Sequence, residues 1–163
     1  MSRSICVTAA LALAFALAPT AALAAPQQRQ AEQFGLGLGG SWWGGGVAGR
    51  YNLSDTRFVQ GSIGTVGTPD ARGPGLTFDY MLRTKELKNN GDVALSAYFG
   101  GGASLGGSDD DGPILGLLPG AGLQIDVLEL PIDINIEYRP LVAVLPDPNI
   151  GLIGLGVRVH YWF

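Results

Sequence analysis

PIDINIEYR (residues 131–139) and IGLGVRVHYWF (residues 153–163) are two stretches in which apolar and polar side chains alternate. In the first stretch, one face carries Ile132, Ile134, Ile136 and Tyr138, and the other carries Asp133, Asn135, Glu137 and Arg139. A period of two residues is typical of a β-strand that separates an apolar surface from a polar one. The alternation does not say which surface is inside. A soluble barrel buries the isoleucines, whereas an outer-membrane barrel turns them toward lipid.

The rest of the chain extends this pattern to eight expected strands. Clusters of Gly, Pro, Asn and Asp separate them, and Asn90-Gly91 is a strong hairpin signal because both central positions of a type I′ turn need a positive φ. The expected strands are Phe34–Gly40, Gly44–Leu53, Arg57–Val66, Gly75–Leu82, Asp92–Ser104, Ile114–Ile125, Ile132–Val144 and Ile150–Phe163. The sequence therefore predicts an all-β fold, an eight-stranded antiparallel up-and-down β-barrel.

Glycine is unusually frequent, at 26 of 163 residues, and it falls inside the apolar stretches without a period of three. Glycine inside strands marks bends and close backbone approach, as tightly curved barrels require. The formal net charge of −4 argues against a nucleic-acid partner.

Residues 1–24 read as a cleaved signal peptide. Arg3 precedes an apolar stretch, and Ala22-x-Ala24 fits the small-residue pattern of a signal-peptidase site. An uncleaved membrane anchor is the alternative, because the apolar stretch is nearly long enough to span. Cys6, the only cysteine, lies in this segment, so we expect no disulfide in the mature chain. We expect a polar tail over residues 25–33 and one barrel domain over residues 34–163.

Three features favour the outer membrane over a soluble location. The signal exports the chain, exported soluble domains of this size often carry disulfides, and aromatic residues gather near expected strand ends. Interfacial girdles of transmembrane barrels are built from such residues. The aromatic residues expected at the interface are Trp42, Trp43, Tyr51, Phe58, Tyr161 and Phe163.

The chain resembles the small eight-stranded bacterial outer-membrane barrels, such as the OmpA transmembrane domain and OmpX. IEYRPLVAVLP followed by GLGVRVHYWF (residues 136–163) is similar to the closing hairpin of small outer-membrane barrel families of uncharacterised function. A final strand with Tyr161 and a terminal Phe163 resembles the C-terminal signal that the barrel assembly machinery reads in such proteins. The resemblance implies a transmembrane barrel in the bacterial cell outer membrane, with lipid and lipopolysaccharide around it. It implies little about activity.

We expect a lumen filled by side chains rather than a pore, because eight strands leave little room inside. A polar, ion-paired network inside the barrel is the simplest interpretation of its charged residues. The residues expected in it are Arg50, Asp79, Asn135, Glu137, Arg139, Arg158 and His160, together with Gln60, Tyr98 and Gln124. The function expected from this network is structural or surface-interactive, by a monomer without a cofactor.

Two other functions stay open at this point. One is a periplasmic, lipocalin-like barrel that binds a small ligand in an apolar cavity. The other is an outer-membrane enzyme that modifies lipid A, which needs a nucleophile beside a base. His160 is the only histidine and has no evident serine partner, so we expect no enzymatic activity. Asp109 to Asp111 could hold a divalent cation in an outer loop, but their spacing does not fit a calcium-binding loop. We expect no resident metal.

Overall fold

The computed structural model describes residues 33–67, 72–108, 112–145 and 148–163. The expected signal peptide, residues 25–32 of the expected tail, and Asp109 to Asp111 lie outside these residues. All regular structure in the described part of the chain is β-strand. None of the described segments forms a helix long and apolar enough to cross a membrane.

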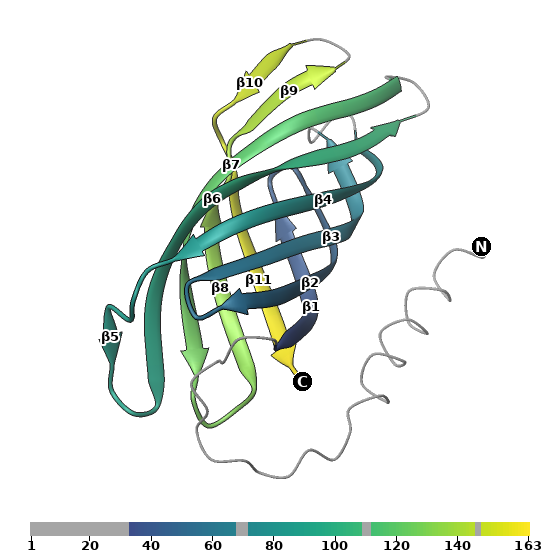
Figure 1. Cartoon of the computed structure of the whole chain (residues 1–163). Coiled ribbons are helices and arrows are strands. Elements are labelled where there is room, and N and C mark those ends of the chain that lie inside the picture. Colours follow the sequence, from purple (N-terminus) through teal and green to yellow (C-terminus); the bar gives the residue numbers. More distant parts are fainter. Residues whose placement is uncertain (1–32, 68–71, 109–111, 146–147) are drawn as a thin grey trace, which may run out of the picture.

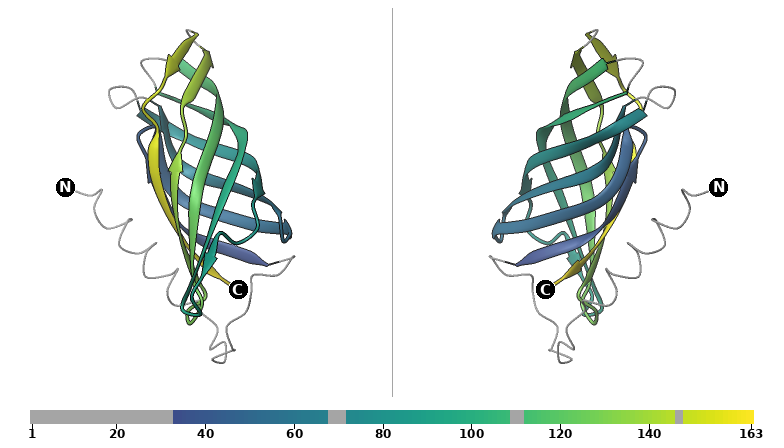
Figure 2. Two further views of the ribbon diagram at one scale, coloured as in Figure 1. Left: turned by 90° about the vertical axis from the view of Figure 1, so that its left-hand side faces the viewer. Right: turned by 90° about the vertical axis from the view of Figure 1, so that its right-hand side faces the viewer.

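Eight strands form a closed antiparallel barrel, as predicted (Figure 1). They hydrogen-bond in the ring order β1, β2, β3, β4, β6, β7, β8, β11 and back to β1. Their bounds are Phe34–Ser41 (β1), Gly44–Ser54 (β2), Arg57–Gly67 (β3), Arg72–Arg83 (β4), Val93–Ser108 (β6), Gly112–Val127 (β7), Ile132–Tyr138 (β8) and Leu155–Trp162 (β11). The strands are inclined and wrap around the barrel (Figure 2).

Three short strands extend the ring. β9 (Leu141–Leu145) pairs with β7 and with β10 (Asn149–Gly151) at the end of the barrel called the upper end here (Figure 1). β5 (Lys88–Asn89) pairs with β6 near the lower end, where the chain terminates. The predicted hairpin at Asn90-Gly91 joins β5 to β6, and Gly91 has a φ of 91°.

The seventh and eighth expected strands are each broken in two. β8 ends before Arg139 and Pro140, and β9 follows; β10 and β11 are separated at residues 152–154. Pro140 interrupts the ladder because proline has no N–H to donate. The two breaks lie side by side, since the Arg139 N–H donates to the Gly154 carbonyl oxygen at 2.6 Å.

Pro119 lies inside β7 rather than at the margin of the strand. It pairs with Gly101 of β6 on one side. On its other side, the pairing of β7 with β8 ends at Ala121 and the pairing with β9 ends at Leu117. Pro119 therefore occupies the gap between two partner strands, where a missing N–H removes no ladder bond.

The barrel closes between β1 and β11, with seven residue pairs from Gly35↔Trp162 to Ser41↔Gly156. The inner face of β1 carries glycine at residues 35, 37 and 39. These glycines lie opposite Trp162, His160 and Arg158, which point inward from β11. The closing strand thus places large side chains into space that the first strand leaves empty.

The barrel is polar inside and apolar outside. Thirteen polar or charged residues of the described chain are buried, while 29 large hydrophobic side chains are exposed. Two small apolar clusters also lie inside, Phe58 with Met81 and Tyr98, and Trp43 with Leu118 and Leu141. Most outward positions of the strands carry Leu, Ile, Val or aromatic residues.

Candidate functional site

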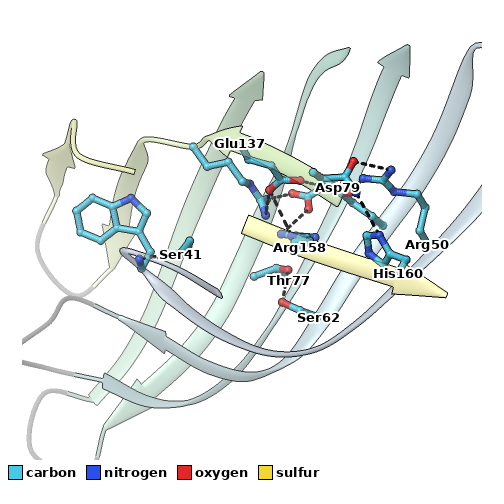
Figure 3. Close-up of polar contacts among 12 residues, drawn as sticks. Ser41, Arg50, Ser62, Thr77, Asp79, Glu137, Arg158 and His160 are labelled. Carbon is cyan, nitrogen blue, oxygen red and sulfur yellow. Dashed lines mark hydrogen bonds and ion pairs between the residues drawn. The ribbon is translucent and has the colours of Figure 1, made fainter. Parts of the chain in front are cut away.

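The buried network of the lumen is the candidate site. The seven residues expected in it, Arg50, Asp79, Asn135, Glu137, Arg139, Arg158 and His160, are all buried within the barrel. Figure 3 shows Arg158 beside Asp79 and Glu137, and Arg50 farther along the lumen near His160. The side chains come from β2, β4, β8 and β11, and from the break after β8, so these seven residues join four of the eight strands of the ring.

Arg50 organises the lower part of the network. Its guanidinium donates to Gln60 Oε1 (2.6 Å), Gln124 Oε1 (3.0 Å), Asn135 Oδ1 (3.0 Å) and Asp133 Oδ2 (3.4 Å). The guanidinium carbon also lies 4.2 Å from the centroid of the Phe58 ring, within the range of a cation–π contact. The planar fork of arginine suits such a multiple donor role better than the compact ammonium of lysine.

Asp133 is the main acceptor of this lower part. Its Oδ1 lies 2.8 Å from His160 Nδ1 and accepts a hydrogen bond from Asn135 Nδ2 at 2.7 Å. Its Oδ2 accepts a hydrogen bond from Trp162 Nε1 at 3.1 Å. Asp133 was not among the expected site residues, although it lies on the same face of the alternating PIDINIEYR stretch as Asn135 and Glu137. That shared face was the signal that could have identified it.

Glu137 is the centre of the upper part. Its Oε1 accepts hydrogen bonds from Tyr98 OH (2.7 Å) and from Gln60 Nε2 (3.1 Å). Its Oε2 lies 3.3 Å from Arg158 Nε and 3.7 Å from Arg139 Nη1. Gln60 therefore connects the lower part, through Arg50, with the upper part, through Glu137.

Asp79 completes the upper part from the opposite wall. Its Oδ1 accepts a hydrogen bond from Arg139 Nη2, and its Oδ2 lies 3.9 Å from Arg158 Nη2. Two arginines and two carboxylates thus form a layer across the lumen in which formal charges cancel. Buried charges need such partners, because their removal from water is otherwise costly.

Two aromatic residues are placed differently from expectation. Phe58 is fully buried and faces inward, with its ring edge-on to Tyr98 at a centroid distance of 5.4 Å. Period-two alternation explains this, because Phe58 lies on the same face of β3 as Gln60. Trp43 is also buried, against Leu118 and Leu141, rather than at an interface. Its position follows from the short β1–β2 turn, in which the Trp43 N–H donates to Ser41 Oγ at 3.2 Å.

The other expected interface aromatics lie outside or at the rim. Trp42 at the upper end is 48% exposed. Tyr51 and Phe163 are exposed at the lower end, and the Phe163 N–H donates to the carbonyl oxygen of Phe34 at 3.0 Å. The partly exposed Tyr161 ring packs against Phe163, with ring centroids 5.0 Å apart. Tyr161 and Phe163 therefore lie where the first and last strands of the barrel meet, and Tyr51 lies on β2 opposite Phe34.

His160 and Asp133 resemble two members of a catalytic triad, but His160 Nε2 has no hydrogen-bond partner within the described chain. In the described residues, no group of three or more His, Cys, Asp or Glu side chains is arranged to hold a metal ion. The site that the structure shows is a hydrogen-bonded, ion-paired network.

Comparison with models of known protein families and with curated proteins gives no match to this chain. Its function is therefore inferred from the barrel and the residues inside and outside it.

Proposed function

We propose that the chain is a small, monomeric β-barrel of the bacterial outer membrane, similar to the OmpA and OmpX type, with a plugged lumen and a structural or surface-interaction role. The observation that carries this proposal is the polarity of the barrel, which is polar inside and apolar outside. In lipid, a closed barrel satisfies every backbone hydrogen bond while presenting apolar side chains to the acyl chains.

The outward residues around β3 illustrate the point. Ile63 is 75% exposed, the largest exposed fraction among the hydrophobic residues of the barrel. It pairs with Val47 on β2 and Leu76 on β4, which are also exposed. Soluble monomers rarely expose continuous apolar patches of more than a few hundred Å2. A lipid environment removes the free-energy cost of exposing such a patch to water.

The aromatic residues at both ends support the same proposal. Trp42 lies at the upper end, and Phe34, Tyr51 and Phe163 lie at the lower end, all with exposed rings. Interfacial aromatics place an apolar ring body in the membrane and a polar edge in water. Outer-membrane lipid and lipopolysaccharide are therefore the proposed partners of the wall, with the barrel assembly machinery as the partner during insertion.

The interior supports a plug rather than a pore or an enzyme. The ion-paired layer of Asp79, Glu137, Arg139 and Arg158 crosses the lumen, and Arg50 with its partners fills the part below. A periplasmic barrel that binds a small apolar ligand is the second candidate. Ligand pockets are usually apolar cavities of several hundred Å3. The cavity beside the ion-paired layer measures about 30 Å3 and is lined in part by hydroxyls and arginines.

Cell fractionation with a heat-modifiability assay tests the proposal. A folded transmembrane barrel resists detergent until it is heated, because its ladder closes without an edge. We expect the chain in the outer-membrane fraction, running faster on a gel before boiling than after it. Recovery only from the soluble periplasmic fraction would overturn the membrane proposal and favour the ligand-binding barrel.

A further inference from the structure

A small cavity lies in the lumen next to the ion-paired layer, toward the β1–β2 turn. It has a volume of about 30 Å3, and Arg139 and Arg158 contribute to its lining. Several hydroxyl-bearing residues line it as well, namely Ser41, Ser62, Thr77 and Ser104. Trp43, packed against Leu118 and Leu141, lines the cavity too. One water molecule needs roughly 10–15 Å3 by a comparable measure, so only a very small guest fits.

Four buried polar atoms of the lining residues have no hydrogen-bond partner within the described chain. They are Trp43 Nε1, Ser104 Oγ, Arg139 Nε and Arg158 Nη1. Each of these residues is at least nine-tenths buried, with exposed fractions of 9%, 1%, 4% and 7% respectively. Buried polar groups are almost always satisfied, so a group of them around one cavity indicates a binding partner there.

The chemistry of these atoms defines that partner. Indole and guanidinium nitrogens only donate, so three of the four atoms require an acceptor. Ser62 and Thr77 bond each other, with 2.9 Å between their hydroxyl oxygens, which leaves one hydroxyl hydrogen of the pair able to donate as well. No Asp or Glu is among the residues that line the cavity. The unpartnered atoms of the lining are therefore mostly donors, and no carboxylate of the lining is there to accept from them.

We propose that this cavity binds one small inorganic anion of halide size, with Arg158 Nη1 and Ser104 Oγ among its donors. A halide accepts hydrogen bonds and donates none, which matches the lining better than water does. The two arginines and two carboxylates of the adjacent layer cancel in charge, so the unpartnered donors, rather than a net positive charge, provide the affinity. Binding in the millimolar range is expected. The inference depends on the lumen geometry and not on the cellular location of the barrel.

Bromide serves as the probe, because a heavy halide quenches tryptophan fluorescence at short range. The folded full-length chain carrying Trp42→Phe, which removes the exposed indole, is titrated with sodium bromide at constant ionic strength against sodium gluconate. We expect a quenching component that saturates. Ser104→Ala removes one donor and is expected to raise the half-saturating bromide concentration about tenfold, the usual effect of losing a hydrogen bond to a charged group.

Ser96→Ala is the matched control. Ser96 lies on β6 like Ser104, and its buried hydroxyl also has no partner, but it does not line the cavity. The Ser96→Ala curve should match that of the parent chain. Quenching that rises linearly with bromide, as expected for a merely hydrated cavity, would overturn the proposal, and so would equal shifts in the two serine variants.

A second measurement does not depend on any substitution. Crystals of the unmodified chain soaked in bromide should show an anomalous peak inside the cavity, within hydrogen-bond distance of Arg158 Nη1. Peaks confined to the protein surface would contradict an internal anion site.

Discussion

The side chain of Arg158 lies directly across Gly39 of the neighbouring strand. A Cβ atom on residue 39 would lie 2.6 Å from Arg158 Cγ. Gly39 and Arg158 are partners in the β1–β11 pairing that closes the barrel. The glycine thus provides the space from which Arg158 reaches Glu137, with 3.3 Å between Arg158 Nε and Glu137 Oε2.

Gly39→Ala should destabilise the barrel by about 1–3 kcal/mol, the usual cost of overpacking a filled interior. The added methyl displaces Arg158 from its ion pair with Glu137. Gly40→Ala is the control, because a Cβ there meets nothing within 4 Å. The control should be neutral or up to about 1 kcal/mol more stable, since alanine restricts the unfolded chain. Urea unfolding in detergent measures both, and equal effects would contradict the packing role of Gly39.

Glu137→Gln should cost about 3–5 kcal/mol of unfolding free energy, because it leaves Arg139 and Arg158 buried with a single carboxylate between them. The shape of the side chain is nearly unchanged, so lost charge rather than lost packing causes the effect. Glu129→Gln, at an exposed position between β7 and β8, should change stability by less than about 0.5 kcal/mol. A Glu137→Gln barrel as stable as this control would show that the ion-paired layer contributes little.

Arg50→Lys keeps the positive charge but loses the planar fork that reaches Gln60, Gln124 and Asn135. We expect a loss of about 2–4 kcal/mol from hydrogen bonds that one ammonium group cannot replace. Arg57→Lys at an exposed position on β3 is the matched substitution and should leave the free energy of unfolding nearly unchanged. The comparison requires both variants to be measured by the same urea titration. Similar midpoints would mean that charge alone, without fork geometry, holds the lower network.

Ile63→Arg distinguishes a lipid-facing wall from a water-facing one. At the middle of a transmembrane strand, an outward arginine costs about 2–4 kcal/mol. In a soluble barrel, the same exposed substitution changes stability by roughly 0.5 kcal/mol or less. The yield of heat-modifiable barrel after folding into lipid vesicles is the measurement, with Ile63→Leu as the control. Efficient folding of the arginine variant would count against the membrane proposal.

The strand pattern was predictable because each strand separates two different surfaces. Alternation placed Asn135 and Glu137 on one face and Ile134 and Ile136 on the other, and the structure keeps these faces. The breaks in the last two expected strands were less visible. Pro140 signals one of them. The break at residues 152–154 lies beside the break at Arg139, where the Gly154 carbonyl oxygen accepts a hydrogen bond from the Arg139 N–H, and nothing local in the sequence signals it.

The partners inside the lumen were not predictable, because they are far apart in sequence. Arg50 and Asp133 are separated by 83 residues, and their contact depends on the register of the whole ring. The place of Phe58 near a strand end predicts the interface, whereas its position two residues from the buried Gln60 places it inside. For residues near strand ends, the alternation of inward and outward positions along the strand is a better guide than the residue type.

With the proposed membrane location, the outward orientation of the apolar side chains also predicts the medium in which this chain folds. Hydrophobic collapse in water gathers apolar groups at the centre, where this barrel carries Arg50, Asp133 and Glu137. Diluting the denatured chain from urea into plain buffer therefore favours aggregates, since exposed apolar segments associate with one another. Dilution into micelles supplies the apolar phase first, and the polar interior then assembles as the ring closes. In the proposed setting, the surrounding amphiphile takes the place that a hydrophobic core has in other small domains.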